Sequence, residues 1–342
     1  MADVGKISPT KITTYMGCSM AYFLNYVVHE KVPTGIRMVF GKDMHYMLEQ
    51  FYDKNFKSPE KFVNSFCYRF KADIAGDFLK GKDKERLIVR EIPYTRKNHL
   101  TGEKEECVLR VGNHVDFGYD NNEDIKNMFF GYRNLGVGIC NRFYTKHKLL
   151  KPPIKKEWSF GVRKDEPVEI NGIPVRGVID RIDNLEEDYY IGDKKIEKGD
   201  YITDYKTDKS SPERDSFTLH RNIQFTFYSY IFRKLFDKEE KAILYYHLRS
   251  DKRFETHRSE KDYDYLKRLL DFVLGGVTKE TFVPFYGFHC NFCSFKSPCE
   301  KYSLPYHGGP RIDLEGRIKP AEEFNDWNAE VPSWIEDQVD ER

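Results

Sequence analysis

Two acidic residues and a lysine, placed at the ends of two predicted neighbouring strands, constrain this 342-residue chain most strongly. The first acid ends the run Gly177-Val-Ile-Asp180, and the second begins the triplet Asp204-Tyr-Lys206. Side chains two residues apart on a strand point to the same face, so Asp204 and Lys206 are expected to lie together. Because paired carboxylates can hold a divalent cation beside a phosphate, the pattern indicates metal-assisted phosphodiester hydrolysis.

The residue types in this pattern suit a hard cation such as Mg²⁺ or Mn²⁺. Such ions take oxygen ligands and keep several waters, so one or two carboxylates are enough to bind them. We expect Asp180 and Asp204 to supply those carboxylates and the backbone carbonyl of Tyr205 to add a third ligand. Lys206 would then hold hydroxide near the phosphate or stabilise the charge of the pentacovalent transition state.

A second triplet of the same type, Asp193-Lys-Lys195, competes with the first. Asp193 is predicted to lie in a glycine-bounded, lysine-rich turn, whereas Ile202 and Tyr205 flank Asp204 as residues of a strand. A predicted helix also follows Lys206 at a short loop distance. The sequence therefore favours Asp204 and Lys206, and solvated surface charge remains the alternative interpretation of either triplet.

Composition indicates a soluble globular protein that can bury a sizeable core. Hydrophobic residues make up 39% of the chain and charged residues 32%, and no run of 18 apolar residues predicts a membrane span. The first residues lack the apolar segment of a signal peptide, so a cytoplasmic location, in a prokaryote or a phage-infected cell, is expected. A net charge of +1 neither requires nor excludes nucleic acid.

The order of predicted elements indicates an α/β fold with a mixed central sheet flanked by helices. Strands are predicted at 157–162, 173–182, 189–191, 201–205 and 242–248, and helices at 8–28, 40–56, 217–236 and 263–274, with 60–150 mostly helical. We expect an N-terminal helical region (1–150), a catalytic core (151–280), a cysteine-containing region that packs with the N-terminus (281–307) and an acidic tail (308–342).

The motifs, taken in order, resemble those of the RecB-like branch of the PD-(D/E)xK nuclease superfamily. The similar segments are Gly41-x-x-x-His45, Gly-Val-Ile-Asp180-Arg-Ile-Asp, Asp204-Tyr-Lys206 and Gln224-x-x-x-Tyr228. The resemblance implies a restriction-endonuclease-like core, with His45, Asp180 and Asp204 as metal ligands and Lys206 as the catalytic lysine. It also implies that Gln224 and Tyr228 order the site and the DNA strand. Glu157 is interpreted as surface charge, with a supporting role beside the metal as the alternative.

Three cysteines near the C-terminus have spacing that suits a metal centre, Cys290-x-x-Cys293-x₅-Cys299. A zinc ribbon would normally supply a second local cysteine pair, and none occurs, so Cys18 is the candidate fourth ligand. The context of Cys18 resembles the N-terminal cysteine motif of AddB-type helicase–nuclease subunits and of CRISPR-adaptation nucleases. That resemblance implies a structural [4Fe–4S] cluster, with zinc, and His289 in place of one thiol, as the alternative.

The resemblance implies a metal-dependent DNA exonuclease that acts on single-stranded or frayed ends in recombination, repair or phage DNA processing. Two alternatives remain: a CRISPR-adaptation nuclease that trims spacer precursors, and a non-catalytic DNA-binding or assembly module on a nuclease fold. No P-loop motif is present, so any helicase would be on another chain. An integrase partner is also expected to be a separate chain.

Overall fold

The computed structural model describes residues 5–97, 104–163, 167–191, 194–212 and 217–301, and the chain forms two compact units. Of the described residues, the first unit comprises 5–31 and those from 151 to 301, and the second comprises those from 32 to 150. The predicted acidic tail and Asp193 lie outside the described residues. Among the described helices, none combines the length and apolar character needed to cross a membrane.

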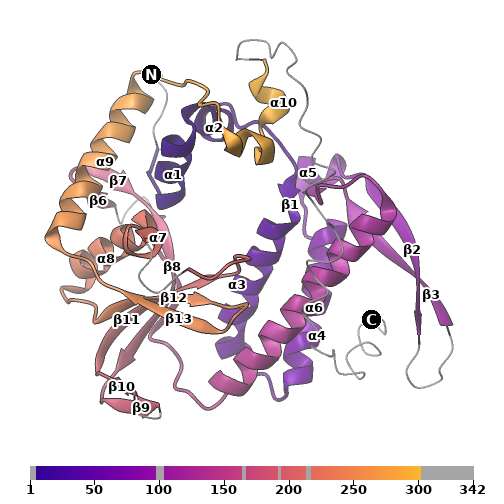
Figure 1. Cartoon of the computed structure of the whole chain (residues 1–342), viewed down its shortest axis with the longest axis horizontal. Coiled ribbons are helices and arrows are strands. Elements are labelled where there is room, and N and C mark those ends of the chain that lie inside the picture. The colour runs from indigo at the N-terminus through magenta and orange to yellow at the C-terminus, as the bar shows by residue number, and fades with distance from the viewer. Residues whose placement is uncertain (1–4, 98–103, 164–166, 192–193, 213–216, 302–342) are drawn as a thin grey trace. The chain divides into compact units, whose positions relative to one another are not determined.

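A mixed five-stranded sheet forms the centre of the first unit (Figure 1). Its strands β11 and β12 pair in parallel and all other neighbours are antiparallel, which confirms the predicted α/β fold with a mixed sheet. This architecture fits a restriction-endonuclease-like core. In spatial order the strands are β13 (Lys252–Thr256), β12 (Ala242–His247), β11 (Gly199–Lys206), β8 (Gly177–Leu185) and β5 (Lys155–Phe160).

Helices of the first unit pack against this sheet because parallel strands need a crossover connection. The crossover from β11 to β12 contains the short helix α7 (Phe217–His220) and α8 (Ile223–Phe236), whereas the sequence predicts one continuous helix there. Asn222 caps α8 with its side chain and separates the two helices. Apolar residues of α8, α9 (Glu260–Thr278) and α1 (Pro9–Gly17) form one core with residues of β8, β11 and β12.

The predicted single N-terminal helix is broken at Cys18, which corrects that expectation. Cys18 adopts an extended conformation, with φ −164° and ψ 111°, between α1 and α2 (Ser19–Tyr22). A π-helical turn, Phe23–Val27, follows α2 directly. The smaller elements of the unit are β6 (Val168–Ile170), β7 (Ile173–Val175), β9 (Tyr189–Ile191), β10 (Lys194–Ile196), the 3₁₀ turn Phe288–Phe292 and α10 (Lys296–Cys299).

The second unit is only partly helical, so the prediction of a mostly helical segment at 60–150 was wrong in one part. A long antiparallel hairpin, β2 (Val89–Lys97) and β3 (Lys104–Gly112), lies within this segment. Phe40, Phe66, Phe70 and Tyr132 are buried between the helices. The other elements are α3 (Ile36–Lys54), α4 (Pro59–Ala75), α5 (Gly81–Glu85), α6 (Asn122–His147), β1 (Thr34–Gly35) and β4 (Val115–Asp116).

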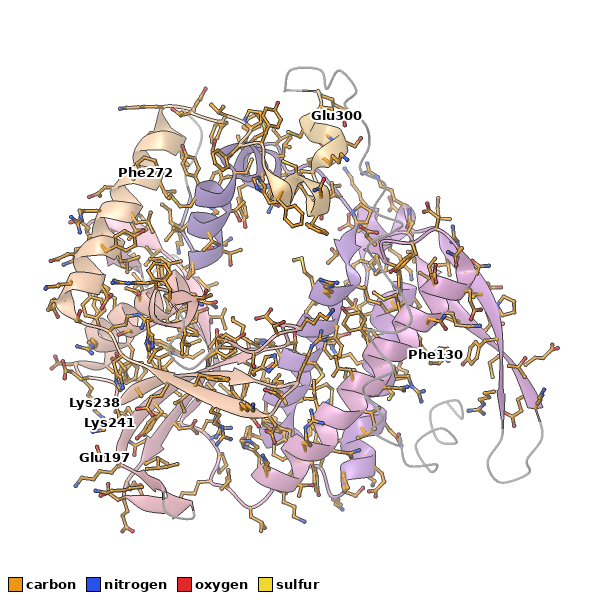
Figure 2. All side chains as sticks on the ribbon, in the orientation of Figure 1. Phe130, Glu197, Lys238, Lys241, Phe272 and Glu300 are labelled. Atoms are coloured by element: carbon orange, nitrogen blue, oxygen red, sulfur yellow. The ribbon has the colours of Figure 1, made fainter. Side chains whose placement is uncertain are left out.

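The end of the sheet at which β11 begins carries ordinary surface charge. Lys241 forms an ion pair with Glu197, and Lys238 lies 3.8 Å from a carboxylate oxygen of Asp200 (Figure 2). The Lys241–Glu197 pair is exposed, and pairs of this type contribute little to the free energy of unfolding. The chemically distinctive charges of β11 lie at its other end, at Asp204 and Lys206.

Candidate active site

The site begins where strands β8 and β11 stop pairing. Their backbone register ends at Thr203 opposite Arg181, one residue before Asp180. Beyond that point a side chain replaces the ladder, because Oδ2 of Asp180 accepts a hydrogen bond of 2.8 Å from the backbone N–H of Tyr205. Asp180 is 7% exposed. Its carboxylate is therefore fixed at the edge of a local gap in the sheet.

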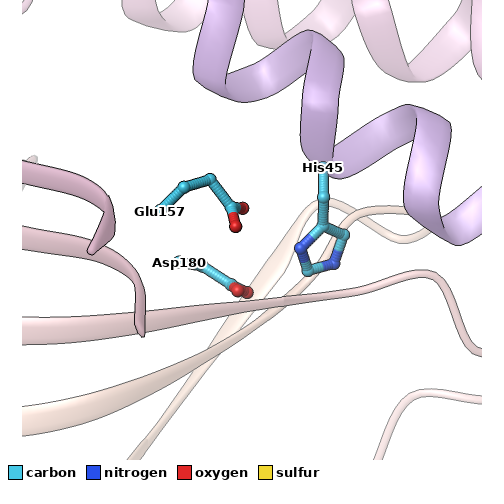
Figure 3. A group of neighbouring side chains, drawn as sticks. All are labelled: His45, Glu157 and Asp180. Atoms are coloured by element: carbon cyan, nitrogen blue, oxygen red, sulfur yellow. The ribbon is translucent and has the colours of Figure 1, made fainter. Parts of the chain in front are cut away.

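Glu157 lies directly across from Asp180 on the neighbouring strand. Lys156 pairs with Arg181 and Trp158 pairs with Ile179, so Glu157 and Asp180 occupy the position between these pairs. The backbone φ of Glu157 is +40°, a conformation that costs a non-glycine residue free energy and tends to occur at functional sites. Carboxylate oxygens of Glu157 and Asp180 lie within 4.8 Å of each other, and Figure 3 shows the two groups side by side.

Asp204 and Lys206 project from the same face of β11, as the strand period requires. Oδ2 of Asp204 lies 2.6 Å from Nζ of Lys206, and the Asp204 side chain is 1% exposed. Burial lowers the pKa of Lys206, but the charges of Asp204 and Asp180 outweigh it, so the pKa is raised above its ordinary value. Lys206 is therefore a fixed cation and not a neutral base.

Helix α8 brings two further side chains to this lysine. Gln224 and Tyr228 are four residues apart and share one face of the helix. Nζ of Lys206 donates to Oε1 of Gln224 at 3.1 Å, and Nε2 of Gln224 donates to the Tyr228 hydroxyl at 2.9 Å. Since a lysine can only donate, the amide oxygen of Gln224 must face it. Asp204, Lys206, Gln224 and Tyr228 thus form one continuous polar chain.

Tyr228, at the end of this polar chain, is affected by the charges of three acids, Asp204, Asp180 and Glu157. Burial raises the pKa of Tyr228 well above its ordinary value, and the charges of Asp204, Asp180 and Glu157 raise it further. Tyr228 therefore stays protonated. The Glu157 and Asp180 carboxylates, whose oxygens lie within 4.8 Å of each other, repel, and a divalent cation would relieve that repulsion. Their oxygen donors are of the type that Mg²⁺ and Mn²⁺ prefer, so the residues present fit such an ion.

The backbone after Lys206 is held by strand β12 and the residues that follow it. Leu248 N–H donates to the carbonyl of Lys206 at 2.9 Å, and Nε of Arg249 donates to the carbonyl of Thr207 at 2.7 Å. The carbonyl of Asp208 is 2.7 Å from Nε2 of His247. These contacts fix the backbone at Lys206, the residue at which β11 ends.

The sequence around this site matches a known protein family. Residues 6–300 match the model of the PD-(D/E)XK nuclease superfamily, which covers most of the chain. The chain belongs to this superfamily. Membership makes it a nuclease of the hydrolase class that acts on nucleic acid. No match is found among curated proteins.

The structure gathers most of the predicted residues of this PD-(D/E)XK protein in the first unit. Asp180, Asp204, Lys206, Gln224 and Tyr228 lie together in the network described above. His45, also labelled in Figure 3, is half-buried on α3 of the second unit. Its role as a ligand, and that of the Tyr205 carbonyl, remain predictions from the sequence.

Glu157 of the PD-(D/E)XK protein differs from its sequence interpretation, whereas Lys195 agrees with its own. Glu157 was interpreted as surface charge, yet its carboxylate is beside that of Asp180. A signal was present, because Glu157 is an acid on the strand predicted just before Asp180. The rival Lys195 lies 2.8 Å from Asp188 and is 46% exposed, as expected for a surface ion pair.

The second acid of the Asp180-Arg-Ile-Asp183 motif faces away from the site. Arg181 binds Asp183 through two hydrogen bonds, of 2.6 and 2.7 Å, and its Nη1 contacts the Tyr205 hydroxyl at 3.3 Å. Arg181, Asp183 and Tyr205 alternate with Asp180 and Asp204 along their strands, so they occupy the opposite face. Asp183 therefore supports the sheet and is not a candidate ligand.

The N-terminal segment lies against the cysteine-containing segment of this nuclease. Ser19 Oγ bonds both the N–H and the carbonyl of Val283, and Cys18 Sγ accepts from the N–H of Phe285 at 3.5 Å. Burial raises the pKa of Cys293, and the nearby thiols of Cys18 and Cys290 add to that effect. Cys299 lies in α10 of the same unit and, like the other three cysteines, is half-buried.

Proposed function

We propose that this protein is a metal-dependent deoxyribonuclease that digests DNA from single-stranded or frayed ends, with Mg²⁺ or Mn²⁺. One observation carries the proposal: a fixed lysine cation is held by Asp204 and Gln224 beside a group of carboxylates. A bound divalent cation would supply Lewis acidity toward a phosphate oxygen and a lowered pKa for water. Membership in the nuclease superfamily supports the hydrolytic class.

Each residue then has a defined task. Asp180 and Asp204 hold the cation, Glu157 adds a third carboxylate from the protein, and His45 and the Tyr205 carbonyl complete the ligand set that the sequence motifs imply. Lys206 places positive charge where the phosphate gains negative charge in the transition state. Gln224 keeps Lys206 in position, and Tyr228, which stays protonated, offers a neutral hydroxyl to Gln224 and the DNA strand.

Digestion of end-labelled DNA tests this function. The substrates are linear and circular DNA, each single- and double-stranded, with Mg²⁺, with Mn²⁺ and with EDTA. We expect stepwise loss from the ends of linear DNA, no cleavage of circles and no activity in EDTA. Cleavage of circular DNA would establish an endonuclease, and metal-dependent binding without any cleavage would favour a non-catalytic DNA-binding module.

We also propose that Cys18, Cys290, Cys293 and Cys299 bind a [4Fe–4S] cluster, as in the AddB-like proteins of the RecB-like branch. The support is the approach of Cys18 to the C-terminal segment and the effect of the Cys18 and Cys290 thiols on the pKa of Cys293. Four thiolates suffice for such a cluster, whose role here would be to join the two ends of the first unit. Protein purified anaerobically should be brown and contain iron, whereas colourless protein containing zinc would overturn the assignment.

A further inference from the structure

A buried arginine that the sequence did not single out contacts the start of α8 at several points. Arg258 lies between β13 and α9 and is 6% exposed. Its Nε donates to Thr226 Oγ1 at 2.8 Å, and its Nη2 donates to the carbonyls of Leu219 and Asn222 at 3.4 and 3.2 Å. These three acceptors belong to α7, to the N-cap and to the first turns of α8.

The remaining donors of Arg258 are also satisfied by uncharged groups. Its Nη1 donates to Thr256 Oγ1 and to the carbonyl of His257, both at 2.7 Å. The guanidinium therefore directs its five N–H groups at hydroxyl and carbonyl oxygens within the described residues. Burial lowers the pKa of Arg258, and the charges of Asp262 and Glu240 offset only part of that effect, so this arrangement is costly where only stability is concerned.

The location of the guanidinium adds to that cost. It lies at the N-terminal end of α8, where the helix dipole disfavours a cation. Its Cζ is 5.9 Å from the centre of the Phe225 ring, which is fully buried. Arg258 thus contacts the helix start by hydrogen bonds and by a cation–π approach, and together these contacts fix that start in three dimensions.

Gln224 lies in the first turn of α8, between two residues that Arg258 contacts, Asn222 and Thr226. The carbonyl of Asn222 accepts a hydrogen bond from Arg258. The side-chain Oδ1 of Asn222 accepts a second hydrogen bond, of 2.9 Å, from the backbone N–H of Gln224. Gln224 in turn accepts the hydrogen bond from Lys206. A continuous series of short contacts therefore runs from Arg258 through Asn222 and Gln224 to the lysine.

We propose that Arg258 is a positioning residue for the proposed nuclease reaction: it fixes the start of α8 so that Gln224 holds Lys206 in its reactive place. The proposal rests on the proposed function, since it assigns Arg258 to the chemistry of that site. Small displacements of a catalytic group are costly, so the effect should appear in kcat more than in KM.

A double-mutant cycle tests whether Arg258 acts through Gln224. We expect Arg258→Met and Gln224→Ala each to lower kcat on single-stranded DNA about 10- to 100-fold, with KM nearly unchanged. In the Gln224→Ala background, Arg258→Met should cost less than about threefold, because the two residues act in series. An equal loss in both backgrounds would overturn the proposal.

Val273→Ala is the matched control. Val273 is fully buried in the core on α9, so the substitution lowers stability, and its apolar side chain cannot form a hydrogen bond with Gln224. Its effect on kcat should be the same in both backgrounds. Arg258→Lys serves if Arg258→Met does not fold. A lysine retains the charge but has fewer donors, so it should restore part of the activity.

Amide hydrogen exchange separates failure of this proposal from failure of the proposed function. In Arg258→Met, residues 222–228 should exchange faster than in the wild type, while residues 263–270 of α9 should not. This measurement needs no nuclease activity. Inactive wild-type protein would refute the proposed function alone, whereas unchanged exchange at 222–228 would refute the role of Arg258 whether or not the protein cleaves DNA.

Discussion

Asp180 takes the place of a missing backbone partner for Tyr205, with its Oδ2 2.8 Å from the Tyr205 nitrogen. The same carboxylate faces Glu157 and is a proposed metal ligand. One side chain thus closes the gap between β8 and β11 and supplies charge to the site. The two roles can be separated, because an amide oxygen can still accept a hydrogen bond but carries no charge.

Asp180→Asn and Asp180→Ala should therefore differ in stability but not in activity. Both should lose nuclease activity by about 100-fold or more, because the ligand charge is gone. Only Asp180→Ala leaves the buried Tyr205 N–H without its acceptor, which should lower the free energy of unfolding by about 1–3 kcal/mol. Urea unfolding and end-labelled DNA digestion measure the two effects. Equal stability of the two variants would contradict the structural role.

Lys206→Ala should abolish DNA cleavage while Lys195→Ala should not. Lys206 is the partner of buried Asp204, whereas Lys195 pairs with Asp188 on the surface. Loss of Lys206 also leaves a buried carboxylate without its cation, at a cost of about 3–5 kcal/mol in the free energy of unfolding, which added Mn²⁺ should partly restore. Digestion and thermal unfolding with and without Mn²⁺ test this. The opposite pattern would assign catalysis to the second triplet.

Glu157→Gln should weaken metal binding and slightly stabilise the protein without metal. Removing one of two neighbouring like charges relieves repulsion with Asp180, while the cation loses a ligand. We expect the dissociation constant for Mn²⁺ to rise about tenfold, which corresponds to about 1.4 kcal/mol.

Calorimetric titration measures the Mn²⁺ affinity, and Glu255→Gln is the control. Glu255 lies on β13 and is 48% exposed, so its loss should leave the affinity unchanged. Unchanged Mn²⁺ affinity in Glu157→Gln would return Glu157 to the surface charge that the sequence suggested.

Stability should fall as the pH is lowered through 6.5, in part because of His247. Its Nε2 donates to the Asp208 carbonyl and its Nδ1 accepts from Ser250 N–H, so the ring is neutral. Burial lowers the pKa of His247 below the ordinary 6.5, so the unfolded chain binds the proton more readily than the folded chain. This contribution is fully present above pH 6.5 and is lost as the pH falls toward the folded pKa.

The free energy of unfolding should therefore depend less on pH between 5 and 7 in His247→Gln than in the wild type. Urea titrations at several pH values measure the slope. His257→Gln is the control, since His257 is on the surface, 64% exposed, with its Nε2 3.3 Å from Glu255. A wild-type slope retained in His247→Gln would remove this residue from the pH response.

The parts of the site that follow from local periodicity could be predicted from the sequence. Asp204 and Lys206 obey the two-residue period of a strand, and Gln224 and Tyr228 the four-residue spacing of a helix face. Glu157 could not be placed in this way. Its proximity to Asp180 depends on the register between β5 and β8 and on its own positive φ, both set by tertiary structure.

Errors in the fold have similar causes. The hairpin of β2 and β3 was missed because Pro93 and many charged residues disguise its strands, and Pro normally argues against a strand. The N-terminal segment has helical periodicity on both sides of Cys18, so the break is visible only in the extended backbone of Cys18. The role of Arg258 could not be predicted from the sequence, because its partners are mostly backbone carbonyls, which leave no motif.

The proposed cluster makes a final prediction that does not depend on nuclease activity. Cys293→Ser should lose most of the iron, about four atoms per chain in a [4Fe–4S] protein, and should unfold at lower temperature. The Cys18 and Cys290 thiols raise the pKa of Cys293, which supports placing these three cysteines in one proposed ligand set. Cys107→Ser on β3 should keep both iron and stability. Iron analysis, visible absorption and thermal unfolding under anaerobic conditions measure this, and equal iron content in both variants would exclude Cys293 as a ligand.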